Sequence, residues 1–161
     1  MPFRLPRIYQ QQGANLLFST IPEAPLWANC RTVVTIHDLI PLRCPNWRSP
    51  LTLYSRYYLP QVINQAQHLI VDSESTLRDV YHFFGKPVYP VSVVPLAYDA
   101  SHYRPLDLPR QRYFLYVGRH DPDKNLGRLL TAFSQMSTPD VHLWMAGSVD
   151  PRFTPTWQAQ A

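Results

Sequence analysis

Two fixed positive charges stand in the loop between a short apolar run and an amphipathic segment. The run Tyr113–Val117 (YFLYV) predicts a buried strand, and Leu126–Met136 has the leucine spacing of a helix with one buried face. A helix that begins at the carboxyl end of a parallel strand favours an anion there, because its dipole and its N–H groups point at that place. We therefore predict a phosphate-binding corner made of Gly118, Arg119, Lys124 and Asn125.

The chemistry of this corner has two interpretations. Arg119 and Lys124 share a short loop, so both can approach one anion and neutralise a departing diphosphate without a metal ion. Alternatively, Arg119 pairs with Asp121 or Asp123, and Lys124 is solvated. In either case we expect Asn125 to cap the N-terminus of the following helix.

A histidine directly follows a second apolar run, Thr32–Ile36 (TVVTI). Ligands bind at the carboxyl ends of parallel strands in α/β sheets, so His37 is the candidate catalytic residue. It can donate to a ligand hydroxyl, stabilise developing charge, or act as an acid or base. The alternative is a histidine that is hydrogen-bonded within its own loop. Asp38 either orients this ring or, as we prefer, caps the turn that follows.

Other polar and aromatic side chains have structural interpretations. Ser73 follows the apolar run HLIV, and we expect it to cap the next helix rather than bind a ligand. An aromatic patch at helical spacing is typical of a core or an interface, and it comprises Tyr54, Tyr57 and Tyr58. His120 lacks the spacing of a metal ligand, as do the other histidines, so we predict no metal site.

Short apolar runs alternate with amphipathic segments along the chain. We predict strands at 15–19, 32–36, 68–71, 91–94, 113–117 and 141–146. We predict the end of a helix at 2–12, helices at 49–67, 76–84 and 126–136, and the start of another at 154–161. Pro60 should kink or split the second of these.

This alternation indicates an α/β fold with parallel, Rossmann-like sheets. The segment 99–112 is polar, contains prolines and has no periodicity, so we interpret it as a linker. It separates a first domain at 1–98 from a second domain at 113–161, which contributes only two predicted strands.

The composition limits the kinds of partner. The chain has 161 residues, a net charge of +4 and 45% hydrophobic residues, enough for a packed core. No basic run is long enough for a nucleic-acid arm, so we predict no nucleic-acid partner. The arginines of the first third reflect a compositional bias or, as the open alternative, peripheral contact with an anionic membrane or an acidic partner. Cys30 and Cys44 indicate a reduced, cytoplasmic protein, and neither a signal peptide nor a membrane span is expected.

Three segments together resemble a known family. VVTIHDLIPLRCP, IVDSESTLRDV and YFLYVGRHDPDKNLGRLLTAF are similar, in this order, to segments of the family 4 (group 1) retaining glycosyltransferases of GT-B fold. The resemblance implies a nucleotide-diphosphate sugar as donor, a glycan or lipid-linked acceptor, and no cofactor or metal. It also implies that Arg119 and Lys124 contact the donor diphosphate and that His37 lies near the transferred sugar.

The resemblance also implies an incomplete enzyme. The family's glycine-rich loop would precede Met1 and its E-x7-E element would follow Ala161, so we expect a central segment with little transferase activity. The Lys-Asn pair is similar to that of mannosyl- and rhamnosyl-transferring relatives. Two alternatives stay open, namely a non-catalytic remnant or interaction module, and another GT-B-like enzyme such as an epimerase or phosphorylase.

Overall fold

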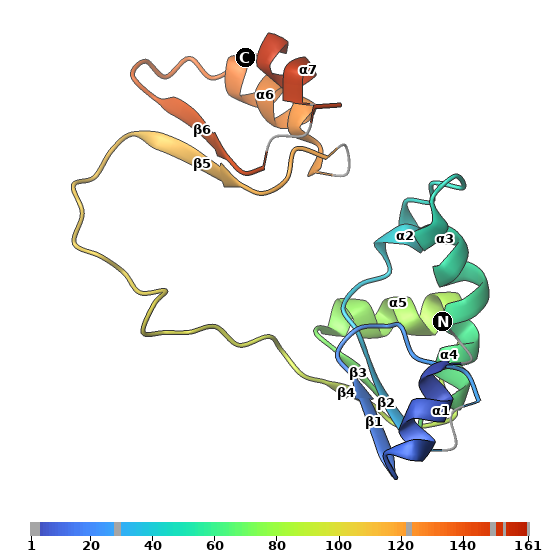
Figure 1. The fold of residues 1–161 in the computed structure, drawn as a ribbon. Helices are drawn as coiled ribbons and strands as arrows, with labels where there is room; N and C mark the ends of the chain where they lie inside the picture. Colours follow the sequence, from blue (N-terminus) through green and yellow to red (C-terminus); the bar gives the residue numbers. More distant parts are fainter. Residues whose placement is uncertain (1–3, 28–29, 122–123, 149–150, 153, 161) are drawn as a thin grey trace. The chain divides into compact units, whose positions relative to one another are not determined.

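The chain folds into two compact units, Met1–His102 and Tyr103–Ala161 (Figure 1). The computed structural model describes residues 4–27, 30–121, 124–148, 151–152 and 154–160. The boundary between the units falls within the segment 99–112, and no helix or strand lies between residues 94 and 112. Each unit is α/β with parallel strands, which confirms the predicted fold class.

The first unit contains a four-stranded parallel sheet in the order β1-β2-β3-β4. Its strands are β1 (Leu16–Ser19), β2 (Arg31–Ile36), β3 (His68–Val71) and β4 (Val91–Val93). Its helices are α1 (Arg4–Gln11), α2 (Ile40–Arg43), α3 (Pro50–Leu53), α4 (Leu59–Gln65) and α5 (Glu74–Phe84), with a π-helical turn, η1 (Tyr54–Tyr58), between α3 and α4. All four strands predicted for this part of the chain are present. The first two residues predicted for the helix at 2–12 lie outside the described residues.

The core of the first unit joins β2 and β3 to α4 and α5. Val34 pairs with Leu69, and two residues on, Ile36 pairs with Val71, so the four side chains share one face of the sheet. These strand residues are buried together with three residues of α4, the residue that follows α4 and one residue of α5: Leu59, Val62, Ile63, Ala66 and Val80. This packing fixes the carboxyl ends of β2 and β3 side by side.

The predicted helix at 49–67 is split ahead of Pro60. The backbone N–H of Leu59 donates to the carbonyl of Tyr54, which closes the wider turn of η1, and Pro60 then lies in the first turn of α4. Proline tolerates this position because it has no N–H to donate. A serine directly before Pro50 predicts an N-cap at Ser49. Ser49 does stand at the N-cap position of α3, but its side chain makes no capping hydrogen bond. The four-residue helix α2 was not predicted.

The second unit contains β5 (Tyr113–Val117), β6 (His142–Ala146), α6 (Leu126–Ser134) and α7 (Thr154–Gln160). The two strands are parallel, and Leu126 and Leu130 bury one face of α6. Both faces of the strand pair are largely open, as the exposure of Phe114 and Leu115 by 51% and 53% illustrates. A two-stranded sheet with one pair of helices cannot cover itself. Ala161, the last residue of the predicted helix, lies outside the described residues.

Candidate functional site

The register of the first sheet brings three chain segments to one edge. Ile36 pairs with Val71, so the next residues, His37 and Asp72, leave the sheet as neighbours. Ser19 ends β1 in register with β2, so Thr20 emerges at the same edge. This is the carboxyl edge of a parallel sheet, where ligands bind in such folds.

Both ring nitrogens of His37 have hydrogen-bond partners. Nδ1 lies 2.7 Å from Oδ2 of Asp72, and Nε2 lies 2.7 Å from the carbonyl oxygen of Thr20. A carboxylate and a carbonyl only accept hydrogen bonds, so both contacts are satisfied only when both nitrogens carry protons. The hydrogen bond to the Asp72 carboxylate, followed by the bond to the Thr20 carbonyl, raises the pKa of His37 above its ordinary value. The arrangement therefore favours an imidazolium cation.

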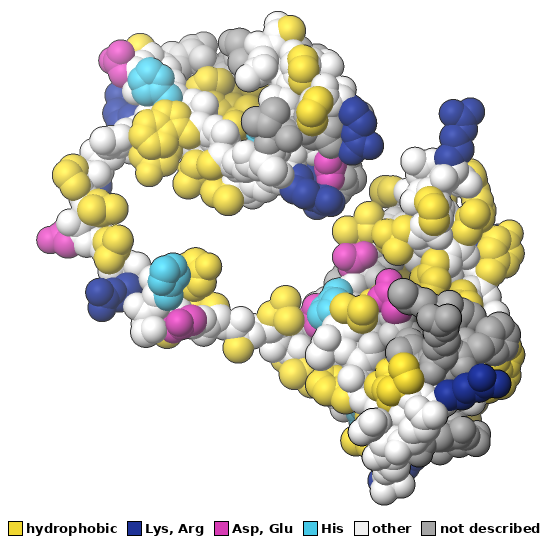
Figure 2. All heavy atoms as spheres, viewed as in Figure 1, with side chains coloured by type: hydrophobic (Ala, Val, Ile, Leu, Met, Phe, Trp, Pro, Cys, Tyr) yellow, Lys and Arg dark blue, Asp and Glu magenta, His cyan; other side chains and the backbone are white. Residues whose placement is uncertain are grey.

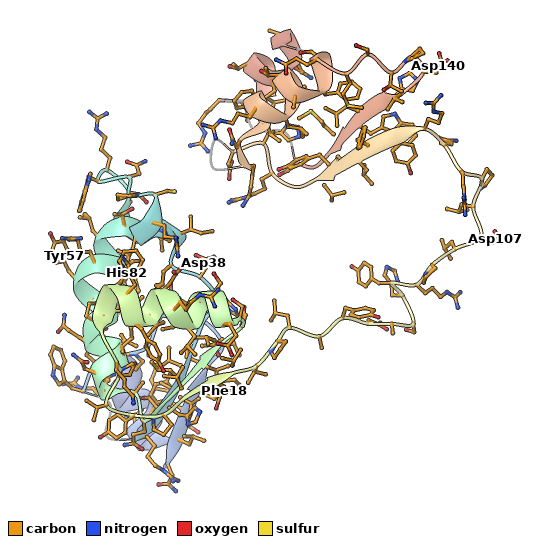
Figure 3. The ribbon with its side chains drawn as sticks, turned by 180° about the vertical axis from the view of Figure 1, so that it is seen from behind. Phe18, Asp38, Tyr57, His82, Asp107 and Asp140 are labelled. Carbon is orange, nitrogen blue, oxygen red and sulfur yellow. The ribbon has the colours of Figure 1, made fainter. Side chains whose placement is uncertain are left out.

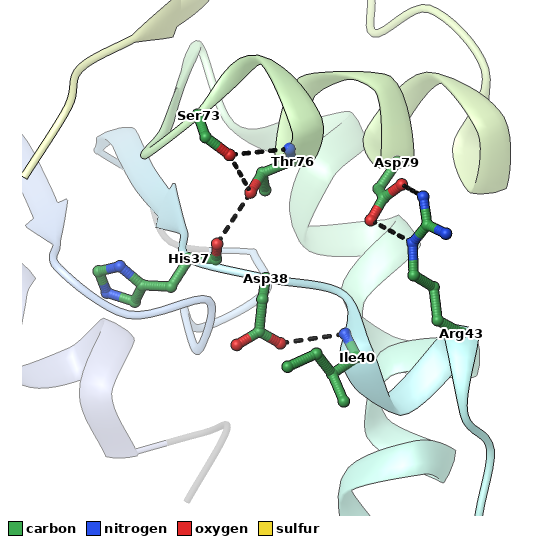
Figure 4. A network of polar contacts seen from close by, with 7 residues as sticks. All are labelled: His37, Asp38, Ile40, Arg43, Ser73, Thr76 and Asp79. Atoms are coloured by element: carbon green, nitrogen blue, oxygen red, sulfur yellow. Dashed lines mark hydrogen bonds and ion pairs between the residues drawn. The ribbon is translucent and has the colours of Figure 1, made fainter. Parts of the chain in front are cut away.

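Asp38 does not orient this ring. Its Oδ1 accepts a hydrogen bond of 3.0 Å from the backbone N–H of Ile40, so it caps the turn into α2, as predicted (Figure 4). The orienting carboxylate is Asp72, which the sequence analysis did not single out. The only sequence signal for Asp72 is its position directly after β3, equivalent to that of His37 after β2.

The backbone of His37 is tied to the N-terminus of α5. The hydroxyl of Thr76 donates to the carbonyl oxygen of His37 over 3.0 Å (Figure 4). Ser73 is the N-cap of α5, and its Oγ accepts from the Thr76 backbone N–H over 3.1 Å, which confirms the capping prediction. Gly85 ends the helix with a φ of 74°, a conformation that glycine adopts readily.

An ion pair holds the far end of the loop that follows His37. The guanidinium of Arg43, at the end of α2, donates from two nitrogens to the carboxylate of Asp79 on α5, one of these bonds being 2.7 Å (Figure 4). The hydrogen bonds from Arg43 lower the pKa of the Asp79 carboxyl. The loop is thus fixed at both ends to α5, through Thr76 and through Asp79.

The predicted phosphate corner begins where two glycines meet. Gly118 follows β5 and donates its backbone N–H to the carbonyl of Ala146 over 2.9 Å. A Cβ atom on Gly147, which follows β6, would lie 1.8 Å from the carbonyl oxygen of Gly118. No side chain fits at Gly147, so the backbones of Gly118 and Gly147 are in direct contact. Gly147 was not predicted as part of the corner, and its signal in the sequence is its position directly after the second strand, equivalent to that of Gly118 after the first.

Both cations of the corner are exposed, and Arg119 is held in an ion pair. Arg119 forms a 2.9 Å ion pair with Asp121, the alternative partner predicted for it, and its side chain is 70% exposed. Asp123, the other predicted partner, lies outside the described residues. Lys124 is exposed at the turn before α6. An exposed pair such as that of Arg119 adds little stability, so an incoming phosphate can replace its carboxylate at small cost.

Asn125 occupies the N-cap position of α6 without capping the helix through its side chain. Its φ of 56° and ψ of 38° place it in the left-handed region, which asparagine tolerates better than most residues. The prediction of the position is confirmed and that of the capping hydrogen bond is wrong. The left-handed conformation of Asn125 turns the loop sharply just before the first turn of α6.

A buried histidine holds the corner to α7. Nδ1 of His120 lies 3.1 Å from Oγ1 of Thr154, and Nε1 of Trp157 donates to the carbonyl of His120 over 3.0 Å. On the other side, the Tyr116 hydroxyl donates to the carbonyl of Arg119 over 2.6 Å. His120 has no predicted role, and in the structure it is a buried packing residue behind the corner. The Nε2 atom of His120 is buried and has no hydrogen-bond partner among the residues that the structure describes.

The described part of the chain contains neither a cluster of metal-ligating side chains nor a helix that could span a membrane. No group of three or more His, Cys, Asp or Glu side chains there is arranged to hold a metal ion. Among the same residues, no helix combines the length and the apolar character that crossing a membrane requires.

The sheet topology and the edge occupied by His37 define the first unit as Rossmann-like. A family model described as Glycosyltransferase Family 4 matches residues 1–102, which is the whole of the first unit. The chain therefore belongs to glycosyltransferase family 4. A comparison with curated proteins found no significant match. Membership of this family implies in general a nucleotide-sugar donor and an acceptor. The second unit, with Arg119 and Lys124, lies outside the matched residues.

Proposed function

We propose that this protein acts in retaining glycosyl transfer of the GT-B type. The donor is a nucleotide-diphosphate sugar that carries a hexose, for which we propose mannose or rhamnose. The acceptor is a glycan or a lipid-linked saccharide. The observation that carries the proposal is the His37 ring, held between Asp72 and the carbonyl of Thr20 at the carboxyl edge of the family 4 unit. A cytoplasmic location is part of the proposal, supported by two unpaired cysteines, Cys30 and Cys44.

In this proposal His37 acts as a cationic hydrogen-bond donor near the transferred sugar. Its Nδ1–H stays on Asp72, which keeps the ring charged and oriented. Its Nε2–H exchanges the carbonyl of Thr20 for a sugar hydroxyl, which replaces one acceptor by another of similar geometry. A fixed positive charge at this point also stabilises negative charge that develops when the donor bond breaks.

The corner of the second unit takes the diphosphate in this proposal. Its residues are Gly118, Arg119, Lys124 and Asn125. The N-terminus of α6 favours an anion at this corner, and the two cations neutralise the departing diphosphate without a metal ion. Arg119 gives up Asp121 to do so, which is inexpensive for a pair this exposed.

A second candidate is a module that binds a nucleotide sugar or a protein without transferring sugar. It is favoured by one observation, that both nitrogens of His37 are already satisfied by Asp72 and Thr20. A histidine held in this way is also what a purely structural role would require. The two candidates differ in whether bound donor is consumed.

The test combines donor binding with turnover. Calorimetry of the purified chain with a panel of nucleoside diphosphates should detect binding, and Arg119→Gln or Lys124→Gln should weaken it about 10- to 100-fold, the range for one lost charge-assisted hydrogen bond. Arg110→Gln removes an exposed charge from the segment before β5 and should leave binding unchanged.

A radiolabelled donor then separates the two candidates. Release of labelled product that is lost in His37→Ala supports transfer over the module, and binding without any release supports donor binding alone. Binding that is equally strong in the Arg119 and Lys124 variants would remove the diphosphate corner from the proposal.

A further inference from the structure

One end of the first unit exposes large apolar side chains together with arginines. We call this the basic–aromatic patch, and it comprises Trp47, Arg48, Leu51, Leu53, Arg56 and Tyr57. Trp47 is 55% exposed and Tyr57 is 63% exposed. Figure 2 shows hydrophobic side chains gathered over α2 and α3 with a basic side chain at the tip, and Figure 3 shows Tyr57 projecting outward from its helix.

The helical segment 50–58 carries most of the patch, packs Tyr54 and Tyr58 against the core and leaves two leucines exposed. Its buried side holds the small polar residues Thr52 and Ser55, which are 2% and 5% exposed. Leu51 and Leu53 lie on either side of these buried residues and are 51% and 44% exposed. A helix on the surface of a globular protein ordinarily turns its leucines inward. The two exposed leucines therefore suit an apolar or amphipathic environment.

The charge of the patch has one sign. Residues 39–71 contain three arginines and no aspartate or glutamate. Arg43 is neutralised by Asp79, whereas Arg48 and Arg56 form no ion pair with any residue the structure describes. The guanidinium of Arg56 lies 5.3 Å from the centre of the Trp47 ring, which holds an arginine and an aromatic side chain together on the surface.

A groove adjoins the patch. It has a volume of about 430 Å³, and Arg56 and Tyr57 form part of its rim. Its other lining residues are mainly apolar and come from α2, α4 and α5: Leu42, Pro60, Asn64, Phe83 and Phe84. A cation beside an apolar wall is the arrangement that accepts an amphiphile with an anionic head.

We propose that the basic–aromatic patch docks on an anionic lipid bilayer. Exposed tryptophan, tyrosine and leucine side chains suit the interfacial layer of a membrane, and arginines suit its anionic headgroups. A second copy of this chain fits less well, because a two-fold contact of the patch with itself would bring four arginines together with no acidic residue of the patch to pair with them. The docking does not depend on glycosyl transfer, so its failure would leave the proposed function standing.

Cosedimentation of the full 161-residue chain with lipid vesicles tests this. The chain should bind vesicles containing about 30% phosphatidylglycerol and bind pure phosphatidylcholine much more weakly. Each arginine near an anionic surface is worth about fivefold in partitioning, so Arg48→Gln with Arg56→Gln should weaken binding about 25-fold. Leu51→Ser with Leu53→Ser should abolish stable binding, although both positions are exposed and the fold should persist by circular dichroism.

Matched controls change the same charge and apolar area elsewhere. Arg104→Gln with Arg110→Gln removes two exposed arginines, and Val88→Ser with Leu106→Ser removes two exposed apolar side chains, 84% and 63% exposed. Both controls should bind anionic vesicles nearly as well as the wild type. Equal losses in controls and patch variants, no preference for anionic lipid, or self-association that the Leu51 and Leu53 changes abolish would overturn the proposal. The last outcome would assign the patch to a second copy.

Discussion

Replacing Asp72 by asparagine should lower the pKa of His37 while leaving the ring in place. Asparagine has nearly the shape of aspartate, and its side-chain oxygen can still accept a hydrogen bond from Nδ1, but it has no negative charge. The hydrogen bond to the Asp72 carboxylate is the largest of the effects that raise the pKa of His37. Its loss leaves the carbonyl of Thr20 as the remaining strong acceptor.

The effect on stability follows from the exposure of the pair. The His37 side chain is 43% exposed and that of Asp72 is 16% exposed, so solvent screens the interaction in part. Exposed ion pairs are worth about 0.2–1 kcal/mol, and the short, half-covered contact here belongs at the upper end, at about 1 kcal/mol.

The sign of the pH dependence is fixed by the direction of the shift. The folded state holds the proton of His37 more tightly than the unfolded state, in which the pKa of histidine is 6.5. The stabilisation is therefore fully present below pH 6.5 and is lost as the pH rises through the raised pKa of the folded state. Asp72→Asn should remove most of this pH-dependent part and leave stability at high pH little changed.

The assay is an NMR titration of the imidazole signals, paired with urea unfolding at about pH 5.5 and about pH 9. Asp38→Asn is the matched control, because Asp38 contacts Ile40 and exerts only the last-ranked effect on His37. The control should move the pKa of His37 less than Asp72→Asn does. An unchanged titration in Asp72→Asn, or equal shifts in both variants, would refute the assignment of Asp72 as the orienting carboxylate.

Three further predictions concern the elements that position the two sites. Ser73→Ala removes the N-cap of α5 and should lower the free energy of unfolding of the first unit by about 1 kcal/mol in urea melts, whereas Ser73→Thr should restore most of it. Gly147→Ala would place a methyl group against the carbonyl of Gly118 and should destabilise the second unit by about 1–3 kcal/mol; amide exchange that stays normal in β5 and β6 would contradict this close contact. Leu126→Ala should cost about 2–5 kcal/mol in the second unit, measured by the same exchange, while β2 and β3 keep wild-type protection.

The order of strands and helices was predictable from local pattern. Runs such as Thr32–Ile36 are apolar, β-branched and too short for helices, so their assignment as buried strands depends on little else. Pro60 predicted a break in the helix at 49–67, because proline cannot donate the backbone hydrogen bond that a continuous helix needs. The form of that break, a π-helical turn over Tyr54–Tyr58, depends on how the flanking helices pack and could not be read from sequence.

Of the capping hydrogen bonds predicted for polar side chains, some form and others do not. Ser73 and Asp38 cap as expected, because each bonds to a backbone group two or three residues away. Ser49 and Asn125 stand at the expected positions without making the expected bonds, because competing backbone conformations near a helix start are close in energy. Which of these backbone conformations a helix start adopts depends on the tertiary packing around it.

The sequence by itself determined that this is an α/β chain with a histidine at the end of one strand and a glycine and an arginine at the end of another. Those features are local, set by hydrophobic period and by the residue that follows each strand. Only the tertiary structure decided the partners, because register across a sheet joins residues far apart in sequence. It placed Asp72 and Thr20 on the ring of His37, and it pressed Gly147 against Gly118.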